Sequence, residues 1–468
     1  MADVTRPARR RPDNPPSLQL PIQGDVTRQA TSSAPADRAE VQRVLDLALG
    51  VGAVLVASGV GAVDATASMA GVTEAYGLRR CQFDVTFTRI TISYRRGIGE
   101  DPLTAMHQVR ARSLDYTRLD AADRLVQRIV AGEIVRDDAQ AELDRLVRAA
   151  HPYPRWVATV ALAAMAAGLA TLFNGGVLVV AVAALTTAAV DRVGRFLNSR
   201  GVLLFFQQVL GAAVATAATL TLKAVGLAPE TNPSVVVAAS IVVLLSGLSV
   251  VGSVQDALTG YYLTAVARGV EIALFSIALF AGVTIALQTG LLLDINVDVN
   301  PEYVDTPAMI PIQVVAGAIA AAAFAVASYA PWRAAAAAGG GGVASSTVFL
   351  LLTYFDFDPV VAAFGAATLV GLVGAVLSRR LKLPPLVFGM AGIIPLVPGL
   401  ATYRGFVELA NENLLGAYSS LTVALGTALA LAAGVLLGHA LAQPVRQRLS
   451  RLERRFRGPR LAGPRPGG

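Results

Sequence analysis

The chain has 468 residues, of which 54% are hydrophobic and only 15% charged, and its mean hydropathy is +0.57. This composition is far more apolar than that of a soluble protein and predicts a membrane protein. The net charge of +7 would suit a nucleic-acid-binding protein, but the basic residues alternate with long apolar stretches, which argues against nucleic acid as a partner. Three histidines and one cysteine leave little material for a metal centre or a Cys–His pair, so no cofactor and no metal is expected.

Residues 1–37 are rich in Pro, Arg, Ser and Asp and contain no apolar core of a secretory signal, so they are predicted to form a disordered arm. The lone Cys81 has no partner for an internal disulfide, which suits a cytoplasmic domain.

Residues 38–154 are predicted to form a small α+β domain. The uncharged stretch Leu47–Val63 could be read as an extra membrane span, but it is short and breaks at Ser58-Gly59. The preferred interpretation is a pair of packed helices, Ala39–Ala57 and Ala62–Tyr76.

Alternating apolar and polar residues over Cys81–Arg95 predict two strands, and His107–Leu114 is expected to add a third. Two amphipathic helices are predicted to follow, over Leu119–Ala131 and Asp137–Ala150. Leu143, Leu146 and Val147 are expected on the apolar face of the second helix.

Ten apolar stretches fill the rest of the chain, most of them near the ~20 residues that a helix needs to cross a bilayer. Helices are expected because a lipid-exposed backbone must satisfy its own hydrogen bonds. The predicted spans are Trp156–Phe173, Gly175–Val190, Gly201–Leu222, Ser234–Val254, Gly269–Leu287, Ile310–Ala330, Ala334–Tyr354, Pro359–Ser378, Leu383–Leu400 and Ser419–Leu441.

The basic residues predict the orientation of these spans. They gather in the tail 442–468 and in alternate turns, while the opposite turns contain only Lys223 and Arg404. By the positive-inside rule both chain termini are expected in the cytoplasm, with the protein in the plasma membrane. The basic tail could also bind anionic lipid, but topological anchoring is the simpler interpretation.

The membrane part is expected to consist of two halves, 155–290 and 310–441, separated by an acidic extracytoplasmic loop over 291–309. Five spans is an odd number, so the second half enters the membrane in the opposite orientation, as in many secondary transporters. A short internal match sets Val251-Gly252 against Pro398-Gly399 and places Asp256 opposite Tyr403; a chance alignment of Val, Leu and Gly is the competing explanation.

Several motifs resemble the threonine/serine exporter family. They are Ala57-Ser-Gly-Val-Gly-Ala-Val63 and Ala75-Tyr-Gly-Leu78 in the soluble domain, and Gly252…Asp256…Gly260-Tyr-Tyr262 and Pro395-Leu-Val-Pro-Gly399 in the membrane part. The resemblance covers roughly residues 40–441. It implies a transporter, not an enzyme, that exports threonine and serine from the cytoplasm and is driven by the proton-motive force. Val251 stands where a proline would be expected before the glycine, which makes a helix break there less secure.

A broken helix is a suitable site for a small amino acid, because its free N–H and C=O groups face the carboxylate and the ammonium. Proline and small polar residues near the two expected breaks are therefore the candidate substrate ligands, against the simpler roles of a packing kink or a close helix contact. The candidates are Ser246, Ser249, Gly252, Ser253, Pro395, Pro398, Gly399, Thr402 and Tyr403.

Proton coupling requires an ionisable group in an accessible cavity. Asp256 is the first candidate because it follows the expected break, and Glu271, with Arg268 as an intrahelical partner, is the second. Asp191 and Glu408 also lie near span ends, where a solvated or arginine-paired carboxylate is the ordinary situation.

Two other functional classes stay open at this stage. A membrane-embedded or membrane-anchored hydrolytic enzyme would need catalytic residues, but the sequence has no His-Glu-x-x-His motif and no Gly before Ser246-Gly247 at the protease spacing. A passive channel would need polar stripes, whereas these spans are dominated by Ala, Val, Leu and Gly. Faces such as Ala321–Ala323 and Gly339–Gly342 can pack within one chain or between the chains of a homo-oligomer.

Overall fold

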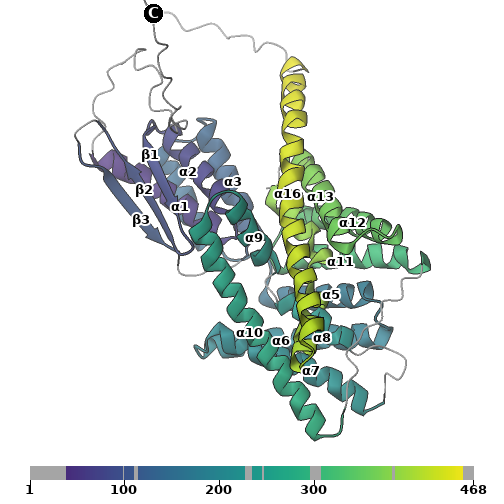
Figure 1. Cartoon of the computed structure of the whole chain (residues 1–468). Helices are drawn as coiled ribbons and strands as arrows, with labels where there is room; N and C mark the ends of the chain where they lie inside the picture. The colour runs from purple at the N-terminus through teal and green to yellow at the C-terminus, as the bar shows by residue number, and fades with distance from the viewer. Residues whose placement is uncertain are drawn as a thin grey trace, which may run out of the picture.

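The computed structural model describes residues 38–97, 100–109, 114–226, 234–244, 247–295, 307–381 and 385–456 (Figure 1). The predicted N-terminal arm, most of the acidic loop and the end of the basic tail lie outside these residues.

The N-terminal domain packs four helices with a three-stranded antiparallel sheet of order β1-β2-β3 (Figure 1). Its core holds apolar side chains of α1 and α2 together with those of β2 and α3. The elements are α1 (Arg38–Ala57), α2 (Ala62–Ala75), β1 (Cys81–Val85), β2 (Arg89–Tyr94), β3 (Leu103–Gln108), α3 (Tyr116–Val130) and α4 (Arg136–Arg148). Leu47–Val63 thus forms two helices around a turn at Gly59, whose φ of +91° suits glycine.

Two details of this domain differ from the sequence predictions. The third strand begins at Leu103, four residues before the predicted start, because Leu103 pairs with Tyr94 in the antiparallel register. Val147 is 50% exposed, while Leu143 and Leu146 are buried, so the apolar face of α4 is narrower than predicted.

Twelve helices and two 3₁₀ turns make up the described residues of the membrane part. They are α5 (Arg155–Leu172), α6 (Val177–Ser199), α7 (Leu204–Ala224), α8 (Ser234–Leu244), α9 (Gly247–Leu258), α10 (Tyr262–Leu292), η1 (Pro307–Met309), α11 (Ile310–Ala327), α12 (Trp332–Tyr354), α13 (Pro359–Leu381), α14 (Pro385–Gly392), η2 (Ile394–Leu396), α15 (Gly399–Ala410) and α16 (Leu414–Phe456). Among the described residues, eight helices are long and apolar enough to cross a membrane, and a ninth candidate is the pair α8–α9, bent by 50°.

Two predicted spans need correction. Leu383–Leu400 is not one straight helix: it contains α14 and η2, and α15 begins at Gly399 and runs on to Ala410. The reason is local, since Pro395 and Pro398 remove backbone donors and stop a continuous helix. The helix of the last span is longer than predicted: it begins at Leu414 and continues through part of the basic tail to Phe456, while its membrane-crossing stretch, Leu414–Ala442, ends one residue after the predicted Leu441.

Three helices in each half of the membrane part have the same length as the helix at the same position in the other half. α5 and α11 each have 18 residues, α6 and α12 each have 23, and α9 and α15 each have 12. The first, second and fourth turns of each half also place a left-handed residue at the same position, in the pairs Asn174 and Tyr329, Gly201 and Asp356, and Gly260 and Glu412.

The N-terminal domain is bonded to one turn from each half. From the first half, Tyr261 Oη lies 3.0 Å from Thr66 Oγ1, and Thr264 Oγ1 donates to the carbonyl of Val85 at 2.9 Å. From the second half, the carbonyl of Ser328 accepts from the Tyr116 amide at 2.9 Å. The α9–α10 and α11–α12 turns therefore lie on the same side of the bundle, next to this domain (Figure 1).

Candidate functional site

The two interrupted helices contact each other beside their breaks. Gly399, the first residue of α15, packs directly on Val242 near the end of α8, where a Cβ atom would overlap Cγ2 of Val242. Glycine at this position allows the close approach of the two helices. The start of α15 and the end of α8 therefore lie against each other.

The second break is enclosed by small residues of α11 and α12. Ser345 Oγ donates to the carbonyl of Gly392 at 2.6 Å, which satisfies a backbone group at the end of α14. Gly341 lies so close to Gly392 that a Cβ atom would be 3.1 Å from its Cα. Pro395 is buried in η2. This break is closely packed.

The predicted substrate residues do not gather around one cavity. Ser246 lies outside the described residues, and Ser249 is half-buried on α9. Ser253 Oγ donates to the carbonyl of Ala265 at 2.8 Å, and Thr402 Oγ1 donates to that of Pro398 at 2.7 Å. Tyr403 is buried in an apolar cluster with Ile241.

Gly252 does not mark the first break. It lies inside α9, and the 50° bend separates α8, which Leu244 ends, from the stretch Ser249–Leu258 that contains Gly252. Glycine is needed there for another reason, because a Cβ atom would stand 2.6 Å from Nη1 of Arg268. Counted back from the ends of the two helices, at Leu258 and Ala410, Gly399 of α15 corresponds to Gly247 of α9 and not to Gly252, so the structure favours another register for the repeat than the predicted one.

This register also changes the residue opposite Asp256. Counted back from the last residue of each helix, Asp256 of α9 corresponds to Glu408 of α15, not to Tyr403. Counted from the first residue of the next helix in each half, Arg268 of α10 corresponds to Ser420 of α16. Both pairs are in contact, since Arg268 Nη1 lies 3.2 Å from Asp256 Oδ2 and Ser420 Oγ donates to Glu408 Oε2 at 2.7 Å.

Asp256 is almost fully buried, with 1% exposure, and so is Arg268, with 5%. Asp256 Oδ1 also accepts a 3.0 Å hydrogen bond from the amide of Ala62, the first residue of α2. A carboxylate at a helix N-terminus satisfies a free amide and interacts well with the helix dipole. One carboxylate thus joins α9, α10 and the N-terminal domain, and Arg268 pairs with it instead of with Glu271, which is half-buried.

Asp64, in the first turn of α2, is a carboxylate of the N-terminal domain that interacts electrostatically with Asp256. Partial removal from water, and then the negative charge of Asp256, raise the pKa of the Asp64 carboxyl above its ordinary value. A proton is therefore held more readily at this junction than on an isolated aspartate.

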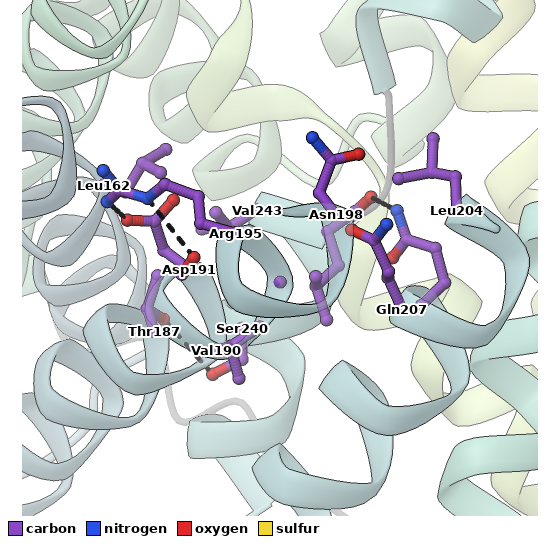
Figure 2. Close-up of a pocket in the computed structure, with 13 residues that line it drawn as sticks. Leu162, Thr187, Val190, Asp191, Arg195, Asn198, Leu204, Gln207, Ser240 and Val243 are labelled. Carbon is purple, nitrogen blue, oxygen red and sulfur yellow. Dashed lines mark hydrogen bonds and ion pairs between the residues drawn. The ribbon is translucent and has the colours of Figure 1, made fainter. Parts of the chain in front are cut away.

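A partly open cavity of about 400 Å³, lined by apolar side chains and by several polar ones, lies between α5, α6, α7 and α8, beside the first break (Figure 2). Its size is within the usual range of small-molecule sites. It is called the α6–α8 cavity here and is lined by Leu162, Thr187, Val190, Asp191, Gly194, Arg195, Asn198, Leu204, Gln207, Gln208, Ser240, Val243 and Leu244.

An ion pair and several uncharged polar groups face this cavity. Asp191 and Arg195 of α6 form the ion pair, which is partly exposed at 19% and 32% (Figure 2). Arg195 also bonds to Thr159 Oγ1 and, at 3.3 Å, to the carbonyl of Arg155. Gln208 Nε2 donates to the carbonyl of Leu244 at 3.3 Å, at the end of α8.

Sequence reasoning identified Asp191 only as an ordinary boundary carboxylate and missed the other polar residues of the cavity. The available signal was the series of polar residues Thr187, Asp191 and Arg195 at spacings of four on an otherwise apolar helix. Among the described residues, no group of three or more His, Cys, Asp or Glu side chains could hold a metal ion.

The fold is thus that of a multi-pass membrane protein with interrupted helices and a cavity lined in part by polar groups, the design of a transport protein. Two family models match the chain. One described as "Putative threonine/serine exporter" covers residues 46–290, and one described as "Threonine/Serine exporter, ThrE" covers residues 313–441.

The chain is 40% identical over 446 residues to a "Probable threonine/serine exporter" of Mycobacterium tuberculosis, covering 94% of this chain and 83% of that relative. It is 36% identical over 441 residues to a "Threonine/serine exporter" of Corynebacterium glutamicum, covering 92% and 87%. No solved structure matches the chain. The chain belongs to the threonine/serine exporter family, whose members' names point to a transporter and not to an enzyme.

Proposed function

We propose that this protein exports threonine, serine and similar small amino acids from the cytoplasm across the plasma membrane, and that the proton-motive force drives the export. The observation that carries this proposal is the contact of two interrupted helices at Val242 and Gly399, next to a cavity lined in part by polar groups in an apolar bundle. Interrupted helices at the interface of two halves are the usual substrate site of secondary transporters. Membership of the exporter family supports the direction and the substrate class.

The two halves form an inverted repeat of five spans each in this proposal. α8–α9 is the fourth span and α14–α15 the ninth, which makes ten. The equal helix lengths and turns of the two halves support the repeat, and five spans per half reverse the second half. The contacts of the N-terminal domain with the α9–α10 and α11–α12 turns support the orientation, because both turns are predicted to be cytoplasmic.

Asp256 is the proposed proton-coupling residue. It lies in an interrupted helix and is held by Arg268, with the Asp64 carboxyl nearby and the Ala62 amide bonded to it. Protonation would weaken its bonds to both partners and so favour a different arrangement of α9 and α10. Glu271 remains the second candidate, since it lies one turn after Arg268 on α10.

The predicted substrate residues divide into two groups under this proposal. Pro395, Pro398 and Gly399 shape the second break. Ser249, Gly252, Ser253, Thr402 and Tyr403, with Ser246, flank the breaks and contact substrate only after the helices rearrange, because the hydroxyls of Ser253 and Thr402 bond to the backbone here.

The test is coupled flux in proteoliposomes that contain the purified protein. Radiolabelled threonine or serine should accumulate against its gradient when a proton gradient is imposed, and an uncoupler should abolish the accumulation. Flux that is insensitive to the uncoupler would indicate a passive channel. Turnover of the amino acid without flux would indicate a membrane enzyme.

A further inference from the structure

We propose that the α6–α8 cavity is the binding site for the zwitterion of the exported amino acid, open on the side of the N-terminal domain. This inference rests on the proposed function and adds a location and a set of ligands to it. Asp191 would bind the ammonium, Arg195 the carboxylate, and Thr187 with Ser240 the side-chain hydroxyl. None of these residues belongs to the helix breaks that the sequence singled out.

The charges of the cavity match those of the ligand. A small amino acid has one positive and one negative group a few ångströms apart, and Asp191 and Arg195 present one charge of each sign on neighbouring turns of α6. The Asp191 side chain is 19% exposed, so it is accessible yet largely withdrawn from water. Such partial burial strengthens charge recognition relative to a fully solvated pair.

Two uncharged groups point to a ligand hydroxyl. Thr187 is 3% exposed and Ser240 is 1% exposed, and their hydroxyl oxygens lie 3.4 Å apart (Figure 2). This separation is long for an O–H···O bond, which leaves both hydroxyls able to form a better one. A buried hydroxyl pair on α6 and α8 favours a ligand that itself carries a hydroxyl.

Gln208 supplies an independent observation. Its side chain lines the cavity and is only 9% exposed, and its Oε1 is buried without a hydrogen-bond partner among the described residues. Buried acceptors of this kind are rare in folded proteins because each unmet bond costs free energy. An ammonium or hydroxyl donor in the cavity would satisfy it.

The location of the cavity sets the side from which the ligand enters. Arg195 bonds to the carbonyl of Arg155, the first residue of α5, which follows the N-terminal domain directly. The cavity is thus at the level of that domain and at the end of α6. The end of α8 at Leu244 forms its inner wall, so a bound ligand would contact the first break.

The second half of the bundle lacks this polar set. Counted from the helix starts, Thr187, Asp191 and Arg195 of α6 correspond to Gly342, Ser346 and Leu350 of α12, and Gln207 and Gln208 of α7 correspond to Ala362 and Ala363 of α13. A Cβ atom at Gly342 would lie 2.6 Å from the carbonyl oxygen of Gly317, so this region is closed by helix packing. The polar residues are therefore not required by the repeated fold itself.

The test is equilibrium binding of radiolabelled threonine to the full-length protein in lipid nanodiscs, with 2-aminobutyrate, which lacks the hydroxyl, as the competitor. Thr187→Val keeps the shape of the side chain and removes its hydroxyl. It should weaken threonine binding about tenfold, a loss of one buried hydrogen bond, and leave 2-aminobutyrate binding as in the wild type. The ratio of the two affinities does not depend on the folded fraction.

Asp191→Asn should weaken the binding of threonine and 2-aminobutyrate alike by tenfold or more, because both ligands carry the ammonium. Ser346→Ala, at the corresponding position of α12, is the matched control and should leave both affinities unchanged. If Thr187→Val keeps the wild-type preference and Asp191→Asn the wild-type affinity, the cavity is not the site. A different result would overturn the proposed function alone. In that case the wild-type protein binds threonine, Thr187→Val and Asp191→Asn weaken binding as expected, and no proton-driven flux is observed; the binding site would then stand without the transport function.

Discussion

The first and second halves of the membrane part share the lengths of three helix pairs but have different interiors. Beside α6 the first half has a partly open cavity with an ion pair in its lining, whereas beside α12 the second half brings Gly341 against Gly392 and Gly342 against Gly317. The fourth turns differ in the same way: Asp256 and Arg268 form a buried ion pair, while Glu408 and Ser420 form a half-buried hydrogen bond. A repeated fold can therefore be specialised by a few side chains, with charge in one half and close packing in the other.

The largest difference between the two halves is expected when their acidic residues Asp256 and Glu408 are replaced. Asp256→Asn should leave Arg268 buried without its counter-charge, and breaking such a pair typically costs about 3–5 kcal/mol. The melting temperature of the detergent-solubilised protein should fall, and proton-driven efflux of threonine from loaded cells should be lost.

Glu408→Gln is the matched control for this change, because it keeps an acceptor for Ser420 at the corresponding position. It should retain most of the stability and the efflux. If both variants lose stability and efflux to the same extent, the two halves are not specialised as described. If Asp256→Asn keeps full efflux, Asp256 is not the proton-coupling residue.

The contact of the two interrupted helices gives the next largest effect. Gly399→Ala should separate α15 from Val242 of α8, and overpacking of this kind costs about 1–3 kcal/mol. Gly269→Ala is the control, since a Cβ atom there meets nothing within 4 Å. Efflux and melting temperature should drop for Gly399→Ala only; a tolerated alanine at both positions would contradict the close contact.

The pH dependence of stability should also distinguish the α9–α10 turn of the first half from the α15–α16 turn of the second half. The carboxylate Asp64 of the N-terminal domain interacts with Asp256, close to the α9–α10 turn. The pKa of Asp64 is raised by partial removal from water and then by Asp256, so the folded protein holds its proton more tightly than the unfolded chain. This contribution to stability is fully present below the ordinary pKa of 3.8 and is lost as the pH rises through the raised pKa.

Asp64→Asn should therefore reduce the fall in melting temperature between pH 4.5 and about 7, as measured on the full-length protein. Asp84→Asn, on β1 of the same domain, serves as the control and should keep the wild-type slope. If the melting temperature of Asp64→Asn changes with pH as it does in the wild type, the proposed interaction of Asp64 with Asp256 is contradicted.

The smallest effects are expected where the N-terminal domain meets the second half. The hydroxyl of Tyr116 is buried without a hydrogen-bond partner among the described residues, and burial raises its pKa. Tyr116→Phe should be neutral or slightly stabilising, because it removes an unsatisfied group and keeps the ring contact with Phe324. Thr117→Val removes a bond to the carbonyl of Tyr329 and should cost about 0.5–1.5 kcal/mol in thermal unfolding. If Tyr116→Phe destabilises the protein more than Thr117→Val does, the described contact of the N-terminal domain with the α11–α12 turn is contradicted.

Much of the fold could be predicted because its causes are local. Apolar stretches of sufficient length mark most spans, and the prolines at 395 and 398 mark the second break. The sequence predicts the first break at Gly252, whereas Gly252 lies inside α9, because a glycine that allows a break and a glycine that makes room for a neighbouring side chain look alike in sequence. Only the position of Arg268 in space shows that Gly252 makes room for a side chain.

The candidate site was less predictable because it depends on contacts between distant segments. The bond between Asp256 and Ala62 joins residues 194 positions apart, and the periodicity of apolar residues along the sequence does not predict it. The polar residues of α6 and α7 were visible individually, but their convergence on Ser240 required the packing of α8.

The inverted repeat can be tested most directly by labelling two corresponding turns from outside the cell. Both variants use a Cys81→Ser background, which removes the one natural cysteine. Thr259→Cys lies at the start of the α9–α10 turn and Asn411→Cys at the start of the α15–α16 turn, and both positions are exposed. A membrane-impermeant maleimide should label Asn411→Cys in intact cells and Thr259→Cys only after permeabilisation. Labelling of both turns from the same side would contradict the account.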